Sequence, residues 1–449
     1  MEENIIVNKI NKAKENPTFI LAIGFLLLIS LGGLILSTSF VTNTGERTGL
    51  IDSFFVAASA SCVTGLTPLN TAMHWNFWGK LVILILIQIG GLGIMTLASI
   101  IPLILGRKIG IKSRAILKEQ LNVNSMEGLV KLFKYVLAFT IITEGLGALA
   151  LSFSFVPTYG VDKGIWFSIF HSISAFCNAG FDIMGDSIYP LRNNGLVNIT
   201  LMALVIVGGL GFMVTSEIYY KRTFKNLSTH SKLVILVSII LLLLGAFGFF
   251  MIESFDGGVL EGEGLKGAIY QSLFQSVSAR TAGFYSVNLS QIKDSSALFL
   301  MIFMFIGGSP GSTAGGLKTT TFVVLVLASI SVIKKEREPV VFNRHIGEET
   351  IKKALAIFMI SMSIVFLVSF ILTLSEIFDL VDILYETVSA LATVGASRGI
   401  TGGLSNLGKI LIGLCMYLGR VGPMSMAFAF GIKSNKRMTR YPESFISIG

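Results

Sequence analysis

Long apolar stretches constrain this chain more than any other feature of its sequence. The hydrocarbon core of a bilayer is about 30 Å thick, so a helix needs about 20 apolar residues to cross it. Seven stretches are close to that length or longer; they are 18–40, 81–105, 199–219, 232–252, 297–333, 354–375 and 408–431. With 53% hydrophobic and 14% charged residues, a 449-residue chain lacks the polar surface of a soluble protein. The sequence predicts an all-α integral membrane protein surrounded by lipid.

The first apolar stretch is expected to stay in the mature protein as a spanning helix. Residues 1–16 are polar, the apolar run that follows is longer than a signal-peptide core, and no A-x-A site comes after it. The cysteines Cys62, Cys177 and Cys415 are far apart and without nearby histidines. They indicate neither a disulfide framework nor a metal site, and we interpret them as small packing residues.

The charges divide according to the predicted topology. If both termini are cytoplasmic, 24 of the 35 Lys and Arg residues fall in inner segments, whereas more acids than bases fall outside. This distribution follows the positive-inside rule. The net charge of +9 therefore reports orientation in a plasma membrane rather than a nucleic-acid partner.

A short string recurs four times along the chain. The copies are Ser61-Cys62-Val63-Thr64-Gly65-Leu66, Phe176-Cys177-Asn178-Ala179-Gly180-Phe181, Arg280-Thr281-Ala282-Gly283-Phe284 and Ala392-Thr393-Val394-Gly395-Ala396. Successive glycines are 115, 103 and 112 residues apart. A serine precedes each string at a similar distance, namely Ser59, Ser174, Ser278 and Ser389. Near-equal spacing indicates internal duplication.

A second, glycine-rich string follows each copy of the first. The four are Gly90-Gly91-Leu92-Gly93, Gly208-Gly209-Leu210-Gly211, Gly307-Gly308-Ser309-Pro310-Gly311 and Gly419-Arg420-Val421-Gly422-Pro423. Glycines in a membrane span usually indicate close helix packing alone. Because both strings recur in the same order, we favour four tandem repeats instead.

The repeats predict a fold class. Each is a helix, a re-entrant pore loop and a second helix (M1-P-M2), which gives eight transmembrane helices in a pseudo-fourfold arrangement around a central pore. We expect the repeats at 17–105, 131–219, 232–333 and 351–431. Cytoplasmic segments are expected at 1–16, 106–130, 220–231, 334–350 and 432–449.

Four such loops around one axis have the chemistry of an ion filter. A cation that leaves water needs rings of backbone carbonyl oxygens, and irregular backbone is tolerated at this depth where it lines a pore. Glycine permits the backbone angles that aim a carbonyl inward. The predicted lining is Val63, Thr64, Gly65, Asn178, Ala179, Gly180, Thr281, Ala282, Gly283, Thr393, Val394 and Gly395. We expect these residues to be the only metal site, with a monovalent cation as the ion.

The filter strings resemble a known family. Thr393-Val394-Gly395 resembles the first half of a potassium-channel filter, and four single-glycine versions in one chain resemble the Trk/Ktr/HKT superfamily, most of all KtrB-type subunits. The resemblance extends from about residue 17 to the C-terminus. It implies potassium uptake, with sodium as an activator and no organic cofactor in this chain. It also implies a homodimer in a bacterial cell membrane, on a cytoplasmic ring of RCK-type nucleotide-binding subunits (KtrA-like or KtrC-like).

The third repeat contains a run of helix-breaking residues inside its second span. The run 307–319 includes Gly307, Gly308, Ser309, Pro310, Gly311, Ser312, Thr313, Ala314, Gly315, Gly316 and Lys318. A nucleotide P-loop is excluded because Leu317 separates Gly316 from Lys318. A glycine kink that serves packing alone is a second interpretation. We favour an intramembrane loop that blocks conduction, which resembles the gating loop of the family, and we expect this break in the third repeat only.

Three charged residues lie inside predicted spans. Arg420 must face water or an acidic partner, because a buried cation costs about 2.5 to 3.5 kcal/mol or more; in the family the corresponding arginine projects toward the pore below the filter. Glu144 is expected to make a polar bridge or serve helix packing, and Lys318 to reach the inner interface. Together they compose no catalytic site, so an enzyme is not expected.

The leading hypothesis is a potassium-translocating pore, and a sodium-selective or unselective monovalent cation pore is the alternative. Gly65 favours potassium, because some sodium-preferring plant relatives carry serine at the matching position.

Overall fold

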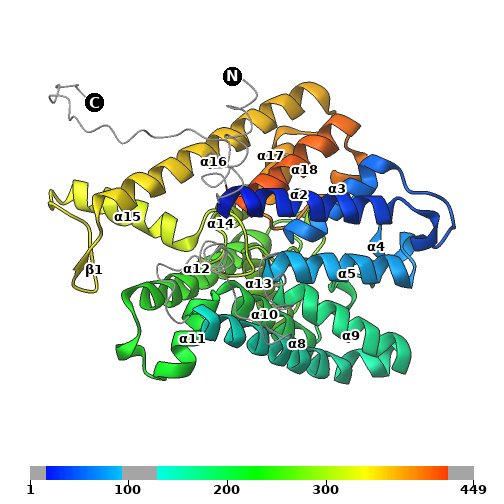
Figure 1. Ribbon diagram of the computed structural model, residues 1–449, viewed down its shortest axis with the longest axis horizontal. Helices are drawn as coiled ribbons and strands as arrows, with labels where there is room; N and C mark the ends of the chain where they lie inside the picture. Colours follow the sequence, from blue (N-terminus) through cyan, green and yellow to red (C-terminus); the bar gives the residue numbers. More distant parts are fainter. Residues whose placement is uncertain (1–16, 94–128, 423–449) are drawn as a thin grey trace, which may run out of the picture.

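The computed structural model describes residues 17–93 and 129–422 (Figure 1). Several sequence expectations lie outside these residues. They are the cytoplasmic ends 1–16 and 432–449, nearly all of the link 106–130, residues 94–105 of the first repeat and 423–431 of the fourth.

Helices make up most of the described chain. They are α2 (Pro17–Leu36), α3 (Leu50–Cys62), α4 (Thr71–His74), α5 (Phe77–Leu92), α8 (Leu129–Tyr159), α9 (Val161–Phe176), α10 (Gly195–Gly209), α11 (Phe212–Lys221), α12 (Thr229–Glu253), α13 (Leu265–Ser278), α14 (Asp294–Phe305), α15 (Thr319–Ile333), α16 (Glu348–Ser375), α17 (Leu380–Leu391) and α18 (Asn406–Val421). The 3₁₀ turns are η1 (Ser39–Val41), η2 (Tyr189–Leu191), η3 (Phe224–Asn226), η4 (Leu289–Gln291) and η5 (Thr401–Gly403). Two short strands, β1 (Val340–Val341) and β2 (Arg344–His345), form an antiparallel hairpin between α15 and α16.

Within residues 17–93 and 129–422, four helices are each long and apolar enough to cross a membrane. Their apolar windows are Phe19–Leu36, Val130–Tyr159, Thr229–Glu253 and Glu348–Ser375, and only 22% to 39% of each window is buried. The outward residues include Leu27 and Phe366, which are 59% and 75% exposed. Such apolar exposure suits hydrocarbon rather than water. The chain is therefore a multi-pass membrane protein with a lipid-facing surface.

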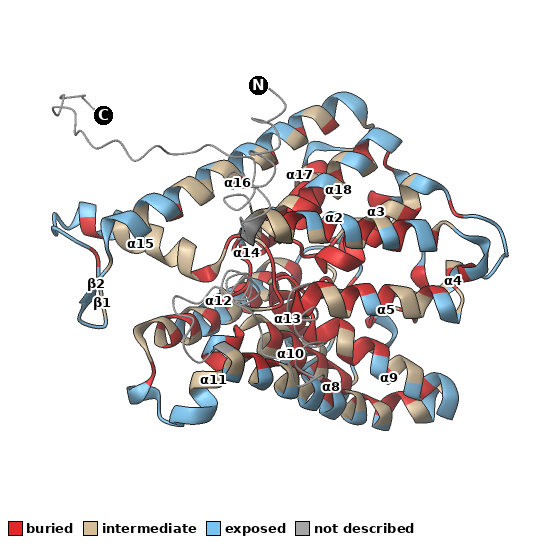
Figure 2. Ribbon diagram, in the orientation of Figure 1, coloured by how far each residue is buried: buried red, intermediate tan, exposed pale blue. Residues whose placement is uncertain are grey.

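Four shorter helices, α3, α9, α13 and α17, lie inside this outer layer. Residues near the carboxyl ends of all four are mostly buried, and Figure 2 shows the buried positions concentrated toward the centre of the molecule. Small side chains make this possible: the last turns of α3 contain Ala57, Ala58, Ser59, Ala60 and Ser61. Close packing lets the four helices converge, and a predicted filter string begins within three residues of each helix end.

The expectation of a single broken helix was wrong. The helix pair α10 and α11 is bent by 98°. Gly211 at this break has φ +95°, and Gly93 and Gly422, which directly follow α5 and α18, have φ +85° and +92°. A left-handed residue ends a right-handed helix, and glycine adopts it without strain. The last glycine of the second string is thus a helix terminator in the first, second and fourth repeats as well.

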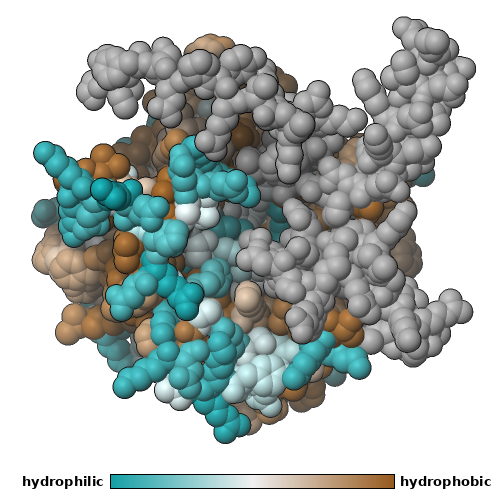
Figure 3. Space-filling model, turned by 60° about the vertical axis from the view of Figure 1, so that its left-hand side comes forward, coloured by the Kyte–Doolittle hydropathy of each residue, from teal (hydrophilic) through white to brown (hydrophobic). Residues whose placement is uncertain are grey.

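Polar residues gather at the end of the molecule that carries β1 and β2. This end lies at the left of Figure 1, and Figure 3 shows it turned forward, with hydrophilic residues grouped on the face and hydrophobic residues around them. Lys334, Lys335 and Arg337 follow α15 here and are exposed.

Candidate functional site

The four filter strings adopt the same backbone conformation. In each, the first and third residues have positive φ: Val63 and Gly65, Asn178 and Gly180, Thr281 and Gly283, Thr393 and Gly395. The residue between them does not. This alternation turns successive carbonyl groups to one side of a strand, as a carbonyl-lined filter requires. Positive φ at β-branched Val63, with φ +58°, is strained, and such strain is typical of functional sites.

The strands form a closed ring. A Cβ added to each glycine would come closer than 3.0 Å to a carbonyl oxygen of the next repeat: Gly65 to Ala179, Gly180 to Ala282, Gly283 to Val394 and Gly395 to Thr64. The contacts therefore run from the first repeat through the second, third and fourth and return to the first. No side chain fits between the strands, so the ring is made of backbone. The structure brings together all twelve residues that the sequence predicted as lining.

The recurrent serines brace these strands. Ser59 and Ser389 accept hydrogen bonds from the amides of Gly65 and Gly395, at 3.0 and 3.1 Å. The hydroxyls of Ser174 and Ser278 donate instead to the carbonyls of Phe181 and Phe284. Each brace joins a pore helix to its own strand. The helices also aim their partly negative carboxyl ends at the ring, which favours a cation there.

The first glycine of each second string packs beneath the ring. A Cβ on Gly90, Gly208 or Gly419 would clash with the carbonyl of Ser61, Phe176 or Leu391, respectively, near the end of a pore helix. In the third repeat Gly307 meets its own loop at Gly315 instead. Close packing against a pore helix thus explains the first glycine of the second string in three repeats. The last glycine of the string explains why the helix ends there.

Residues 307–319 form an irregular segment, which we call the intramembrane loop, between α14 and α15. Thr313 Oγ1 lies 3.1 Å from the carbonyl oxygen of Phe176 and 3.3 Å from the side-chain amide of Asn178. That amide also lies 3.3 Å from Thr281 Oγ1. A Cβ on Gly315 would clash with the side chain of Thr393. The loop therefore touches or approaches three of the four filter strands, on the side of their first residues.

The loop also pairs with the break between α10 and α11. The amides of Ser309 and Thr313 donate to the carbonyls of Gly209 and Gly208, at 3.0 and 3.3 Å, and the amide of Phe212 donates to Gly311 at 2.9 Å. Two helix breaks thus satisfy each other's backbone groups, which have no partner within their own helices. This pairing was not predictable from the sequence, because the glycine-rich string of the second repeat also fits simple helix packing.

Arg420 reaches the intramembrane loop from the opposite wall. Its guanidinium donates to the carbonyl oxygens of Thr313 and Gly90, and to that of Gly91 at 3.2 Å. None of its contacts among the described residues is to a carboxylate. Carbonyl dipoles rather than an acid therefore stabilise the charge, and the side chain ties the loop to α5 and α18.

The side chain of Lys318 bonds within the intramembrane loop. Its ammonium donates to the carbonyl of Ala314 at 2.7 Å, one turn back in the loop. The Ala314 carbonyl lies outside any helix, and the ammonium supplies its hydrogen bond. The lysine side chain therefore folds back onto the loop. That Lys318 reaches the inner interface stays a prediction.

Glu144 makes a polar bridge between helices, as expected. The amide nitrogen of Gln88 on α5 donates to both carboxylate oxygens of Glu144 on α8, at 3.1 and 3.2 Å. The thiol of Cys177 lies 3.9 Å from the same carboxylate. Glu144 thus packs behind the filter strand of the second repeat.

The opposite side of the ring opens into a cavity of about 310 Å³, the outer vestibule. Its lining comes from three repeats and includes Gly65, Thr67, Tyr285, Asn288, Gly395, Ser397 and Thr401. Burial, together with the charges of Asp182 and Asp186, raises the pKa of the Tyr285 phenol to about 12. Tyr285 therefore presents a neutral hydroxyl near the ring at ordinary pH.

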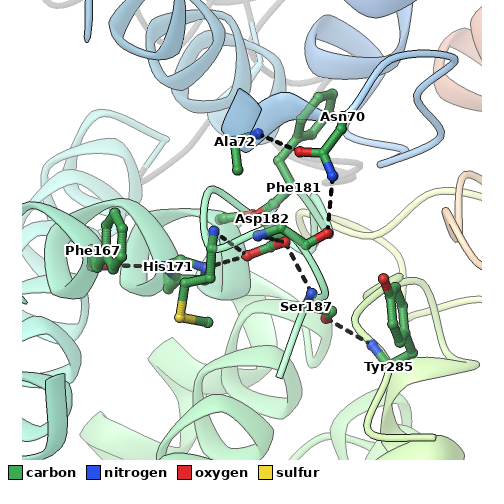
Figure 4. Close-up of polar contacts among 11 residues, drawn as sticks. Asn70, Ala72, Phe167, His171, Phe181, Asp182, Ser187 and Tyr285 are labelled. Atoms are coloured by element: carbon green, nitrogen blue, oxygen red, sulfur yellow. Dashed lines mark hydrogen bonds and ion pairs between the residues drawn. The ribbon is translucent and has the colours of Figure 1, made fainter. Parts of the chain in front are cut away.

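A buried contact between a histidine and an aspartate supports the chain beside this vestibule (Figure 4). His171 Nδ1 lies 2.8 Å from the carbonyl oxygen of Phe167, and Nε2 lies 3.1 Å from Asp182. Both neighbours are acceptors, because the Asp182 carboxylate also accepts the amides of Met184, Gly185 and Ser187. The two contacts hold the ring between α9 and the loop that follows the second filter string. Sequence reasoning missed the pair, since a lone histidine carries no signal.

Comparisons with known proteins agree with this architecture. The family model described as "TrkH: Cation transport protein" matches residues 7–440. The chain belongs to this family. It is accordingly a transport protein rather than an enzyme.

Curated TrkH-family relatives match along nearly the whole chain. The "Potassium/sodium uptake protein NtpJ" of Enterococcus hirae is 40% identical over 99% of this chain and 100% of its own. The "Ktr system potassium uptake protein B" of Bacillus subtilis is 39% identical over 96% and 97%. Among solved structures, the potassium transporter TrkH from Vibrio parahaemolyticus has a TM-score of 0.71 at 18% identity, covering 93% of this chain and 85% of its own. That likeness shows the fold.

Proposed function

We propose that this chain carries potassium into a bacterial cell as the ion-translocating subunit of a Ktr-type uptake system. The closed ring of four backbone strands is the observation that carries the proposal. Twelve residues surround the path, with Thr64, Ala179, Ala282 and Val394 presenting carbonyls to neighbouring glycines. Both relatives are named as potassium uptake proteins, the one from Enterococcus hirae for sodium as well, and this supports potassium as the ion.

Gating is assigned to the intramembrane loop and Arg420. The loop is bonded to the filter side through Thr313 and to the opposite wall through Arg420. Passage of an ion on this side requires the loop to move. A positive charge held there raises the barrier for a cation in the closed state.

The partners follow from the family resemblance and from the polar end of the molecule. We propose a homodimer with cytoplasmic termini, resting on a ring of RCK-type nucleotide-binding subunits that supplies regulation. Sodium is proposed to promote uptake. Potassium-dependent growth of a transport-deficient strain, with and without the ring subunit, tests the partnership: equal growth in both would contradict it.

A sodium-selective or unselective pore remains the alternative function, and ion flux separates the two. Purified protein in liposomes is given equal potassium and sodium gradients, and each flux is read with an ion-selective dye. We expect potassium to dominate. Gly65→Ser should lower the potassium-to-sodium ratio about tenfold, because a side chain at positive φ costs about 1 to 2 kcal/mol. Gly413→Ser is the control, since Gly413 has open space around it. Equal wild-type fluxes would favour the alternative.

A further inference from the structure

Glu386 is a fully buried glutamate on the pore helix α17 of the fourth repeat, with 0% of its surface exposed. Its Oε1 accepts a hydrogen bond from the hydroxyl of Thr401, and Thr401 in turn lies 3.0 Å from the hydroxyl of Ser397. The other carboxylate oxygen, Oε2, has no hydrogen-bond partner. Among the buried carboxylates of residues 17–93 and 129–422, this is the one oxygen left without a partner.

A second buried glutamate shows how this fold satisfies a carboxylate that only supports structure. Glu253, also 0% exposed, ends α12. Its Oε2 accepts the amide of Val259 at 2.8 Å, and its Oε1 accepts the amide of Lys293 at 2.9 Å. Both oxygens are bound, so Glu253 needs nothing further. Glu386 lacks the second bond, and an unsatisfied buried carboxylate is costly unless a cation or a proton neutralises it.

No described cation neutralises Glu386. Arg398 comes from the same loop as Ser397, but its guanidinium pairs with Asp294 and Asp382, each at 2.8 Å. Asp382 lies one turn before Glu386 on α17 and adds negative charge. The region around Glu386 is therefore short of positive charge.

Thr401, which bonds Glu386, and Ser397, which contacts Thr401, line the outer vestibule. Both Ser397 and Thr401 belong to the wall of the 310 Å³ cavity, together with Gly395 of the filter. Their hydroxyl oxygens thus separate an ion in the vestibule from the Glu386 carboxylate. Hydroxyl and carboxylate oxygens are the ligands that hard cations prefer.

We propose that Glu386, Ser397 and Thr401 form a binding site for one sodium ion in the wall of the outer vestibule, separate from the filter. One carboxylate matches a monovalent charge, and no group of three or more His, Cys, Asp or Glu side chains suited to another metal occurs among the described residues. A small hard cation suits a site of side-chain oxygens at the wall. The proposal rests on the proposed cation-uptake function and gives its sodium dependence a location.

Thermal unfolding of the full-length protein in detergent tests binding without transport. Potassium chloride is kept saturating so that the filter is occupied, and sodium chloride is compared with choline chloride. Sodium should raise the wild-type Tm by about 1 to 2 °C or more, because a ligand stabilises the state that binds it. Glu386→Gln keeps the shape and removes the charge, so its sodium-dependent rise should be lost. An equal rise in both proteins, or none in the wild type, would overturn the site.

Flux in liposomes provides the second measurement. The sodium concentration that half-maximally stimulates potassium uptake should increase about tenfold in Glu386→Gln and less in Thr401→Val, because the first removes a negative charge and the second one neutral oxygen. Thr387→Val is the hydroxyl control, because Thr387 bonds its own helix at Ile383. Glu253→Gln is the carboxyl control and should lower Tm while the sodium effect persists.

The two proposals fail separately. Wild-type protein that carries no potassium would contradict the uptake function, while the sodium-dependent Tm would still decide the site. Normal potassium flux with an unchanged sodium response in Glu386→Gln would overturn the site alone.

Discussion

The filter ring and the intramembrane loop beside it are built on opposite plans. In the ring, every repeat contributes the same three-residue strand, the same pair of positive φ angles and the same glycine contact. At the loop, the third repeat supplies the irregular segment and the fourth supplies Arg420. Ion coordination by a ring requires equivalent groups, whereas a blocking segment needs only one. Duplication of one repeat can supply the equivalent groups of the ring. Divergence of a single repeat can supply the blocking segment.

The repeats differ less at the helix break than the sequence suggested. Gly211, at the break after α10, and its equivalents after α5 and α18 show that the first, second and fourth repeats also carry a helix terminator. Only between α14 and α15 is the terminator embedded in a long run of small residues. The loop is therefore an elaboration of a break that the repeats share.

The largest effect is expected from breaking the ring. Gly395 has φ +89°, and a Cβ there would strike the carbonyl of Thr64. Gly395→Ala should lower potassium flux at least about a hundredfold, because a left-handed side chain costs about 1 to 2 kcal/mol and the clash adds to it. Liposome flux measures the change, and Gly413→Ala, at an open glycine of α18, should conduct normally. Normal flux in Gly395→Ala would show that the ring does not form the ion path.

A smaller change of opposite sign is expected on the loop side. Arg420→Gln removes the charge and the bonds to Thr313 and Gly90, so the loop should open more often. Flux without the regulatory subunit should rise about tenfold, since each bond to a charged group is worth about 1.5 to 3 kcal/mol. Lys409→Gln is the matched control, because Lys409 lies on the same helix and pairs with Asp52 away from the loop. Unchanged flux in Arg420→Gln would remove the arginine from gating.

The ring could be predicted from the sequence because it depends on residue size at fixed spacing. Gly65 and its three equivalents are where backbone contact excludes a side chain, and that requirement is visible in the residue itself. The membrane fold was predictable for a similar reason, since hydrophobic length is local. The contact of Thr313 with Asn178, the pairing of the two breaks and the free oxygen of Glu386 were not predictable. Each depends on which segments from different repeats meet, and one sequence does not contain that information.

The smallest effect is expected from a substitution at the contact between the intramembrane loop and the ring. Thr313 Oγ1 joins the loop to the carbonyl of Phe176 and to Asn178, so it connects the asymmetric segment with one strand of the symmetric ring. Thr313→Val preserves the volume and removes about 1 kcal/mol of hydrogen bonding, which corresponds to about a fivefold rise in flux without the regulatory subunit. The potassium-to-sodium ratio should stay unchanged if ring and loop are independent. Thr373→Val, whose hydroxyl bonds only its own helix at Phe370, controls for the substitution. A fall in that ratio would show instead that the loop holds the second strand in shape, and selectivity and gating would then share one contact.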